Sequence, residues 1–471
     1  MPPTPAVRSR ASSLFPYQQE GVRLMKAANF RVLLADDPGL GKTAQVLAAI
    51  RENPQQLLPA LVICPTSVVQ NWVRECMTWL KGVNVQIAVL QGVSDELPED
   101  FQGIVIVGWA ILEDYAKVLK KWGPRLVVAD EAHLAKDHNS GRSEVFFRLG
   151  RRAPHVIPLT GTPLVNIPDD VWNLLDIVKS GCLGERVEFR KLCRDDPEAA
   201  QKLMAPHVIR REFEPTIREI GKTNPSFIVP PRTRIVVNVE ERLLPRGFRA
   251  EYKRADEEFT AWLRDTVPAR LAAEYRRRKM DPKVVSEQFK RDLEGVIRRA
   301  AEYEHLVKTG RLRQLVGEAK VPAVMHWLLP HVQRREGVVI FAEHQGVFEL
   351  MEKALRGASV RFATIYGSNS SDSGSAVDAF QSGRVSVLLS SRAGCQGLTL
   401  TRSCFLGLME RYWTAMHEEQ AESRIWRLTQ KRPCTIVRFQ IPGTYDVRMD
   451  EIVKAKSALS SGLMNVAGET E

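Results

Sequence analysis

The feature that most constrains this chain is residues 32–50, where an apolar run passes through a glycine-containing turn into an apolar-faced helix. Gly39 and Gly41 allow a bent backbone whose N–H groups point inward. The positive end of the dipole of the following helix faces the same point. A strand, a glycine turn and a helix in this order predict a cradle for the phosphates of a nucleotide.

Side chains of the same turn supply the charge that such a cradle needs. Lys42 places a positive charge at the β- and γ-phosphates, and Thr43 offers a hydroxyl to Mg²⁺. The general P-loop pattern has glycine where Asp36 stands, so this chain carries the shortened Gly-x-Gly-Lys-Thr form. We expect the nucleotide to be held by Asp37, Gly39, Leu40, Gly41, Lys42, Thr43 and Ala44.

Short apolar runs rich in Val and Ile recur between helical stretches in both halves of the chain. They lie at 60–64, 85–90, 104–108, 126–130 and 156–160, and again at 338–342, 362–366, 385–390, 404–409 and 435–439. Runs of this kind, alternating with helices, predict parallel sheets that are covered on both faces. The predicted fold class is therefore α/β, with two parallel-sheet lobes.

Acidic residues directly follow one of these runs. They are expected at the carboxyl ends of the strands, where binding and catalytic residues gather in parallel sheets. Asp130 ends the run at 126–130 and can hold Mg²⁺ through water, as a Walker B aspartate does. Glu131 is then placed to orient or deprotonate the attacking water. The string Asp-Glu-Ala-His is short, and it gains its meaning from the P-loop and the buried strand before it.

Three other polar positions are candidates for ligand contacts. Gln18, on an amphipathic helix ahead of the P-loop strand, has an amide that suits the N6/N7 edge of adenine, although an isolated Gln is more often a solvated surface residue. Thr162 follows a strand end and is placed to link the nucleotide to the other face of the domain. Small residues at another strand end suit contacts to a nucleic-acid backbone, with a capping turn as the equal alternative: Pro65, Thr66 and Ser67.

The second sheet pattern has no P-loop of its own, which implies that the second lobe completes the site instead of duplicating it. Arg392 and Gly397 lie in a close-approach loop after a strand, where we expect contacts to nucleic acid and to the nucleotide, respectively. Arg424 and Arg427 stand three apart on one predicted helical face. Such arginines neutralise the charge of a transferring phosphoryl group and are worth ~10³–10⁵ in rate.

Together these motifs resemble the ordered helicase motifs of superfamily 2. The likeness extends over Tyr17-Gln18, Asp36-Asp37-x-Gly-Leu-Gly-Lys-Thr, Pro65-Thr66-Ser67 with Asn71-Trp72 and Glu75, Asp-Glu-Ala-His, and Leu159-Thr160-Gly161-Thr162-Pro163. The Asp-Asp pair and the Asn-Trp with its following Glu are similar to the Swi/Snf-type group in particular. Members of that group usually have Met where this chain has Pro38.

The second half carries the same resemblance. Arg210-Arg211 resembles the arginine pair that closes the first lobe of Swi/Snf-type proteins, and the segment 420–430 resembles their last motif, with Thr429 where the family usually has Gly. Thr399 replaces a common Asn. The segment 410–413, Glu-Arg-Tyr-Trp, resembles the fork-remodelling, annealing-helicase branch.

The resemblance implies two RecA-like lobes facing each other across a cleft, with a helical insertion between them. The expected division is a flexible tail at 1–13, an ATP-binding lobe at 14–205, a linker and helical protrusion at 206–318, and a second lobe at 319–471. Basic runs within the protrusion are either a solvated helical face or a surface near the DNA backbone.

Composition limits the partners and the compartment. A net charge of +11 suggests a polyanionic partner. Seven scattered cysteines without a Cys-x-x-Cys pair support neither a disulfide framework nor zinc. No apolar run reaches the 18 or so residues of a membrane helix, so we expect a cytoplasmic protein. Compactness and the lack of charged tails favour a bacterial or phage-encoded protein over a nuclear one, and we expect a monomer.

The predicted function is an ATP-hydrolysing, DNA-stimulated translocase on double-stranded or forked DNA, favoured over RNA, that remodels or reanneals DNA structures. Three alternatives stay open at this point. They are a strand-separating helicase on DNA or RNA, the motor subunit of a restriction or defence system, and a nucleotide-gated DNA clamp without sustained turnover.

Overall fold

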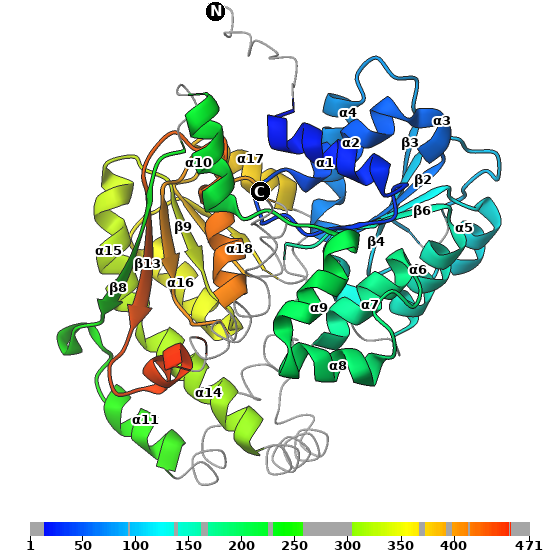
Figure 1. Cartoon of the computed structure of the whole chain (residues 1–471). Helices are drawn as coiled ribbons and strands as arrows, with labels where there is room; N and C mark the ends of the chain where they lie inside the picture. The colour runs from blue at the N-terminus through cyan, green and yellow to red at the C-terminus, as the bar shows by residue number, and fades with distance from the viewer. Residues whose placement is uncertain are drawn as a thin grey trace, which may run out of the picture.

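The computed structural model describes residues 14–92, 95–135, 140–161, 168–224, 229–257, 304–366, 373–391, 398–412, 415–451 and 453 of the 471-residue chain. These residues form two lobes that lie side by side, each built on a parallel sheet with helices on both faces (Figure 1). The predicted α/β class is confirmed.

The sheet of the first lobe has the strand order β3-β4-β2-β5-β6. Its strands are β2 Ala60–Cys64, β3 Ile87–Leu90, β4 Ile104–Gly108, β5 Leu126–Ala129 and β6 His155–Pro158. Two short strands, β1 Leu33–Leu34 and β7 Val208–Ile209, pair with each other, and single bridges from Arg31 and Leu34 join them to the β6 edge. The strand that leads into the glycine turn is therefore held between β6 and β7.

Alternate side chains of β2 point into two separate apolar cores, which is why the run is apolar at every position. Leu61 and Ile63 face the core closed by α5 Ala116–Trp122, α6 Gly141–Arg152, α7 Pro168–Val178, α8 Arg186–Asp195 and α9 Pro197–Met204. Val62 faces the core closed by α1 Pro16–Ala27, α2 Lys42–Glu52 and α4 Val69–Trp79. Burial on both faces fixes the sheet in the middle of the lobe.

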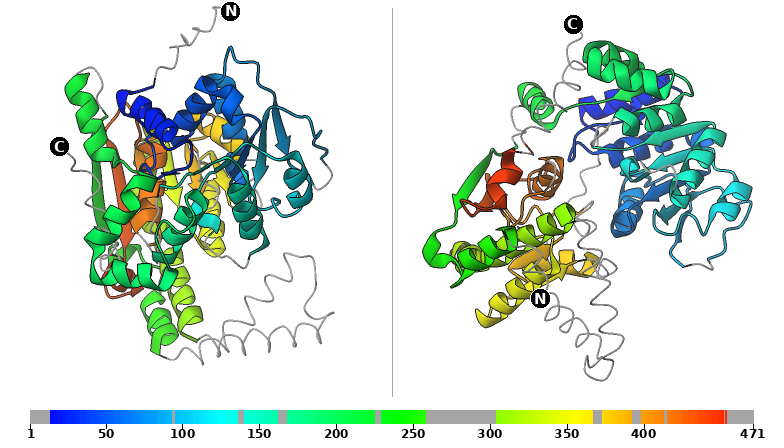
Figure 2. Two further views of the ribbon diagram at one scale, coloured as in Figure 1. Left: turned by 45° about the vertical axis from the view of Figure 1, so that its right-hand side comes forward. Right: turned by 90° about the horizontal axis from the view of Figure 1, so that it is seen from below.

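The sheet of the second lobe has the order β10-β11-β9-β12-β13-β8. Its strands are β8 Arg232–Asn238, β9 Val338–Phe341, β10 Phe362–Ile365, β11 Val387–Ser390, β12 Phe405–Leu408 and β13 Cys434–Gln440. One face is covered by α11 Phe248–Glu257, α14 Glu304–Ala319, α15 Val321–Gln333 and α16 Gln345–Gly357, and the other by α17 Ser373–Gln381 and α18 Ala415–Ile425. Figure 2 shows β8 alongside β13 at the edge of this sheet.

The segment expected as linker and protrusion contributes to both lobes. β7 pairs with β1 in the first lobe, α10 Phe213–Thr223 follows it, and β8 then pairs with β13 in the second lobe. The sequence analysis did not anticipate β8, whose residues are mostly exposed, so that it lacks the buried apolar run of the other strands. Most of the expected protrusion, 258–303, lies outside the described residues.

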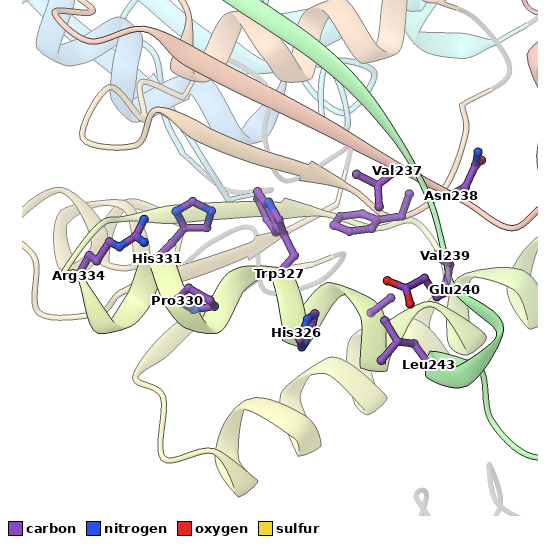
Figure 3. A pocket seen from close by; sticks show the side chains of 12 residues that line it. Val237, Asn238, Val239, Glu240, Leu243, His326, Trp327, Pro330, His331 and Arg334 are labelled. Atoms are coloured by element: carbon purple, nitrogen blue, oxygen red, sulfur yellow. The ribbon is translucent and has the colours of Figure 1, made fainter.

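A pocket of about 380 Å³ opens between β8, β13 and α15 on the second lobe (Figure 3). Trp327 and His331 of α15 line it together with Glu240. None of its lining residues belongs to the predicted nucleotide site. Within the described part of the chain, no helix has the length and hydropathy to cross a bilayer.

A buried charge pair joins three segments of the second lobe. Lys320 is fully buried, and its Nζ lies 2.6 Å from Asp446 Oδ2 and 2.8 Å from the Met409 carbonyl oxygen. Asp446 also accepts a hydrogen bond from the Ile441 N–H at 3.0 Å. The pair therefore ties the end of α14 to the segments after β12 and β13.

We predict that Lys320→Met destabilises the protein by about 3–5 kcal/mol, because it leaves the carboxylate of Asp446 buried without its partner. The double variant Lys320→Met/Asp446→Asn removes that charge and keeps an acceptor for Ile441, so it should recover most of the loss. Urea unfolding monitored by circular dichroism measures both. Equal destabilisation of the single and double variants would contradict the assignment.

Candidate active site

The predicted phosphate cradle is formed where β1 turns into α2. Gly39 and Gly41 have φ values of +96° and +75°, a region that favours glycine. A Cβ at Gly41 would come within 2.6 Å of Gln18 Nε2, and one at Gly39 within 3.1 Å of the Phe213 ring. Both glycines are therefore required by conformation and by close neighbours.

Lys42 begins α2, and its Nζ donates a hydrogen bond to the Asp36 carbonyl oxygen at 2.6 Å. Burial lowers the pKa of Lys42, while the negative charges of Glu131, Asp36 and Asp130 act in the opposite direction. The lysine and the acidic residues after β5 are thus brought together, although 88 positions separate Lys42 from Asp130 in the sequence.

The carboxylate of Asp130 is held from two sides. Trp72 Nε1 donates to Asp130 Oδ2 at 2.9 Å, and the Glu131 N–H donates to Oδ1 at 3.0 Å. Trp109 Nε1 donates to the backbone carbonyl of Asp130 at 2.8 Å. Burial and the neighbouring Glu131 raise the pKa of Asp130 to about 6. Two indole groups therefore fix both the backbone and the side chain of this aspartate.

Glu131 has a φ of +50°, which a non-glycine residue adopts at an energetic cost and which is often found at functional sites. Its Oε2 lies 3.3 Å from His133 Nδ1 and is buried without a hydrogen bond among the described residues. His133 Nδ1 is also 3.4 Å from Thr160 Oγ1. The strained backbone holds a carboxylate with spare acceptor capacity directly after Asp130.

Gln18 braces the glycine turn. Its Nε2 donates to the Leu40 carbonyl oxygen at 3.1 Å, its Oε1 accepts from the Phe15 N–H at 2.9 Å, and the residue is 5% exposed. The neighbouring Tyr17 hydroxyl donates to the same Leu40 oxygen at 2.8 Å. One N–H and one lone pair of the Gln18 amide remain for the predicted contact with adenine.

The two aspartates before the turn are held by the arginine pair at the end of the first lobe. Asp36 is fully buried, and its Oδ2 accepts from Arg211 Nη1 at 3.0 Å and from Gln45 Nε2 at 2.9 Å. Asp37 lies 3.6 Å from Arg210. Burial raises the pKa of Asp36, and the charge of Arg211 opposes that shift. The aspartate that replaces the usual glycine is thus a structural anchor.

Arg427 of the second lobe lies against this turn. Its Cβ is 3.7 Å from the position that a Cβ of Gly39 would occupy. Its Nη1 donates to the Leu398 carbonyl oxygen at 3.3 Å and contacts the Thr399 hydroxyl. Burial, with a smaller contribution from the charge of Arg424, lowers the pKa of Arg427 to about 10. The side chain of Arg427 therefore starts next to the cradle, while its guanidinium group is bonded within its own lobe.

Arg424 and Arg427 do not share one helix, which corrects the sequence-based expectation. Arg424 lies in the last turn of α18, whereas Arg427 follows its end at Ile425. The physical reason is Gln430, whose Nε2 donates to the Ile425 carbonyl oxygen at 2.9 Å and so caps the helix. Arg424 is 5% exposed, and its Nε has no hydrogen bond among the described residues.

The remaining candidates divide into two sets. Pro65, Thr66 and Ser67 follow β2, where Thr66–Val68 forms a short 3-10 turn with Thr66 exposed. The other three lie outside the described residues: Thr162, Arg392 and Gly397.

Three supporting residues were given no role from the sequence. Trp72 was noted only as part of the Asn-Trp motif that resembles the family. No sequence pattern pointed to Trp109 or Phe213, because each contacts a segment far away in the chain.

The residues present fit ATP with Mg²⁺. The turn offers a glycine backbone and a half-buried lysine, and Thr43 is the second residue of α2. Asp130 supplies an oriented carboxylate, and Glu131 has a spare acceptor. Thr43 and Asp130 would hold the metal, since hydroxyl and carboxylate oxygens are its preferred protein ligands.

One phosphate cradle in a parallel-sheet lobe, with an arginine of a second such lobe against it, defines a helicase-like P-loop ATPase of two RecA-like lobes. The SNF2-related domain matches residues 17–240, and the helicase conserved C-terminal domain matches residues 319–429, together more than half of the chain. The chain belongs to the SNF2-related family of helicase-like proteins.

Curated relatives include the protein CHROMATIN REMODELING 19 of Arabidopsis thaliana, 28% identical over 96% of this chain and 69% of its own length. The human DNA annealing helicase and endonuclease ZRANB3 is 25% identical over 96% of this chain and 40% of its own length. The chain also spans 49% of the putative ATP-dependent helicase/translocase YwqA of Bacillus subtilis, at 25% identity. A solved SWI2/SNF2 ATPase core of Sulfolobus solfataricus with dsDNA aligns over 98% of this chain and 96% of that one, with 21% identity and a TM-score of 0.43.

We predict that Trp72→Phe slows ATP turnover by about tenfold or more, because a hydrogen bond to a charged group is worth about 1.5–3 kcal/mol. The matched control is Trp122→Phe, in which a buried indole loses its hydrogen bond to the Phe101 carbonyl oxygen far from Asp130. Phosphate release at saturating ATP measures both variants. Equal rates for the two would remove the role of Trp72 in holding Asp130.

Proposed function

We propose that this protein is an ATP-hydrolysing translocase on double-stranded DNA that remodels or reanneals DNA structures. The observation that carries the proposal is that the side chain of Arg427 starts beside the glycine turn: its Cβ lies 3.7 Å from the position of a Gly39 Cβ, so a cationic side chain of the second lobe is rooted at a phosphate cradle of the first. A site shared in this way links the state of the nucleotide to the position of the lobes.

The proposed chemistry assigns a separate task to each group. Lys42 neutralises the charge of the β- and γ-phosphates, and Glu131 orients the attacking water. Thr43 and Asp130 would hold Mg²⁺, and the ion would supply positive charge that neutralises the charge developing on the phosphates. Arg427 would exchange its bond to the Leu398 carbonyl oxygen for a phosphate oxygen as the lobes close.

The choice of DNA as the partner is supported by charge and by relatives. The chain carries a net charge of +11, which favours a polyanion. One relative is named a DNA annealing helicase and another a helicase/translocase. The segment Glu410–Tyr412 at the end of β12 belongs to the motif that resembles the annealing-helicase branch. Repeated opening and closing of the lobes would then move the protein along a DNA backbone bound across both.

We expect Lys42→Ala and Glu131→Gln each to abolish ATP turnover while DNA binding survives, because both residues act on the phosphates and not on the polyanion. Phosphate release and fluorescence anisotropy of labelled duplex DNA measure the two properties. Turnover at the wild-type rate in either variant would remove that residue from the mechanism.

Arg427→Ala should lower kcat by ~10³-fold or more, the usual worth of such an arginine, with the Kd for ATP close to that of the wild type. Arg432→Ala is the matched control, since Arg432 lies five positions later and bonds to the Arg402 carbonyl oxygen. Single-turnover kinetics and fluorescent-nucleotide titration separate chemistry from binding. A loss of ATP affinity without a loss of kcat would contradict the assigned role.

The nucleic-acid partner is tested by ATP turnover with duplex DNA, forked DNA, single-stranded DNA and RNA. We expect duplex or forked DNA to stimulate turnover most, because the proposed motor follows a duplex backbone. Preference for single strands or RNA would favour a strand-separating helicase instead. Binding without turnover would favour a nucleotide-gated clamp, and co-purification with a nuclease would favour a defence system.

A further inference from the structure

The aromatic ring of Phe213 contacts both the phosphate cradle and Trp426, the residue that precedes Arg427 in the second lobe. The Cε2 atom of Phe213 is 3.1 Å from the position that a Cβ of Gly39 would occupy, so the ring lies against the backbone of the turn. The ring also contacts Trp426 of the second lobe, with ring centroids 4.6 Å apart and planes inclined by 57°. Phe213 and Trp426 are 6% and 5% exposed, and they belong to one apolar cluster with Leu40.

Phe213 is anchored to the cradle through its backbone as well. Its N–H donates to Asp37 Oδ2 at 2.9 Å, and Phe213 is the first residue of α10. The carboxylate of Asp37 thus faces the positive end of the α10 dipole and satisfies one of its free N–H groups. A movement of the residues before Gly39 therefore carries the start of α10 with it.

Trp426 is held just as firmly on the side of the second lobe. Its Nε1 donates to the Pro230 carbonyl oxygen at 2.7 Å, and the guanidinium of Arg232 lies 4.1 Å from the centre of its ring. Arg232 Nη1 is in turn 2.6 Å from Glu422 Oε2 on α18. The indole is wedged between the start of β8 and α18, directly before Arg427 in the chain.

These contacts form a continuous path from the glycine turn to Arg427. The path runs from Gly39 to the ring of Phe213, from there to the ring of Trp426, and on to Arg427 through one peptide bond. Packed interiors transmit displacement because they contain little free volume. A change in the backbone of the turn must therefore displace the Phe213 ring and, through it, Trp426.

We propose that Phe213 and Trp426 are positioning residues that couple the occupation of the phosphate cradle to the placement of the Arg427 guanidinium group. The inference rests on the proposed ATP hydrolysis and adds a route, beside the direct contact of Arg427 with Gly39, by which the two halves of the site act together. Phe213 touches no phosphate, and its effect on the reaction passes through Arg427. Loss of the ring therefore lowers kcat and leaves the affinity for ATP almost unchanged.

The test is a double-mutant cycle on kcat with Phe213→Ala and Arg427→Ala. We expect Phe213→Ala alone to lower kcat by about 10²-fold, the cost of misplacing a catalytic group by an ångström or so. The double variant should be as slow as Arg427→Ala alone, because the ring has no effect once the guanidinium is absent. Effects that multiply in the double variant would overturn the proposal, since a purely structural defect acts independently of Arg427.

The control on the same helix is Ile217→Ala, which removes apolar contact with the same cluster one turn further along α10 without touching Gly39. It should keep kcat within a few-fold of the wild type. Phe213→Leu keeps much of the volume and serves in the cycle if the alanine variant does not fold, as judged by thermal unfolding. A kcat for Ile217→Ala as low as that of Phe213→Ala would also overturn the proposal.

The cycle separates failure of this inference from failure of the proposed function. Absence of ATP hydrolysis by the wild-type protein, with and without DNA, would overturn the proposed function and the coupling together. Hydrolysis by the wild type with multiplicative losses in the cycle overturns the coupling alone. The cycle is run with whichever of duplex DNA, forked DNA, single-stranded DNA and RNA stimulates the wild type most, so a mistaken choice of nucleic acid does not decide its outcome.

Discussion

The buried pair between Asp36 and Arg211 is the interaction on which the rest of the arrangement depends. A carboxylate without exposed surface is tolerated where an opposite charge and hydrogen bonds replace its hydration. Arg211 and Gln45 supply both. Since Arg211 stands just after β7, satisfying Asp36 requires the end of the first lobe to return to the glycine turn. The local departure from the P-loop pattern at Asp36 is thus linked to the course of the chain 175 residues later.

That return decides how the two lobes are joined. α10 begins at Phe213, two residues after Arg211, so the connection to the second lobe departs from the cradle itself. The next strand, β8, pairs with β13, which begins shortly after Arg427 in the chain. The connection and Arg427 are therefore carried by neighbouring strands of one sheet. Ion pairs of Arg232 with Glu422 and Glu214 add a tie between β8, α18 and α10.

What could be predicted from the sequence was local. Apolar runs predict the strands of both large sheets except β8. The residues that end those runs predict the glycine turn and the acids after β5. β8 was missed because its two arginines, Arg232 and Arg234, find their common partner Glu422 some 190 positions away. The end of α18 before Arg427 was missed for a similar reason, because it is set by the side chain of Gln430 and not by glycine or proline.

Three polar side chains around the cradle donate hydrogen bonds to carbonyl oxygens of the protein. Two of them are cations and one is a neutral amide, and this difference in charge separates their tasks. Lys42 donates to the Asp36 carbonyl, Arg427 to that of Leu398 and Gln18 to that of Leu40. When the donor is a cation, exchanging a carbonyl for a phosphate oxygen replaces a contact between a charge and a dipole by a stronger contact between two opposite charges. The two cations therefore gain from a phosphate, whereas the neutral amide of Gln18 gains little by leaving the turn. Gln18 is thus best placed to keep the shape of the cradle while Lys42 and Arg427 respond to what enters it.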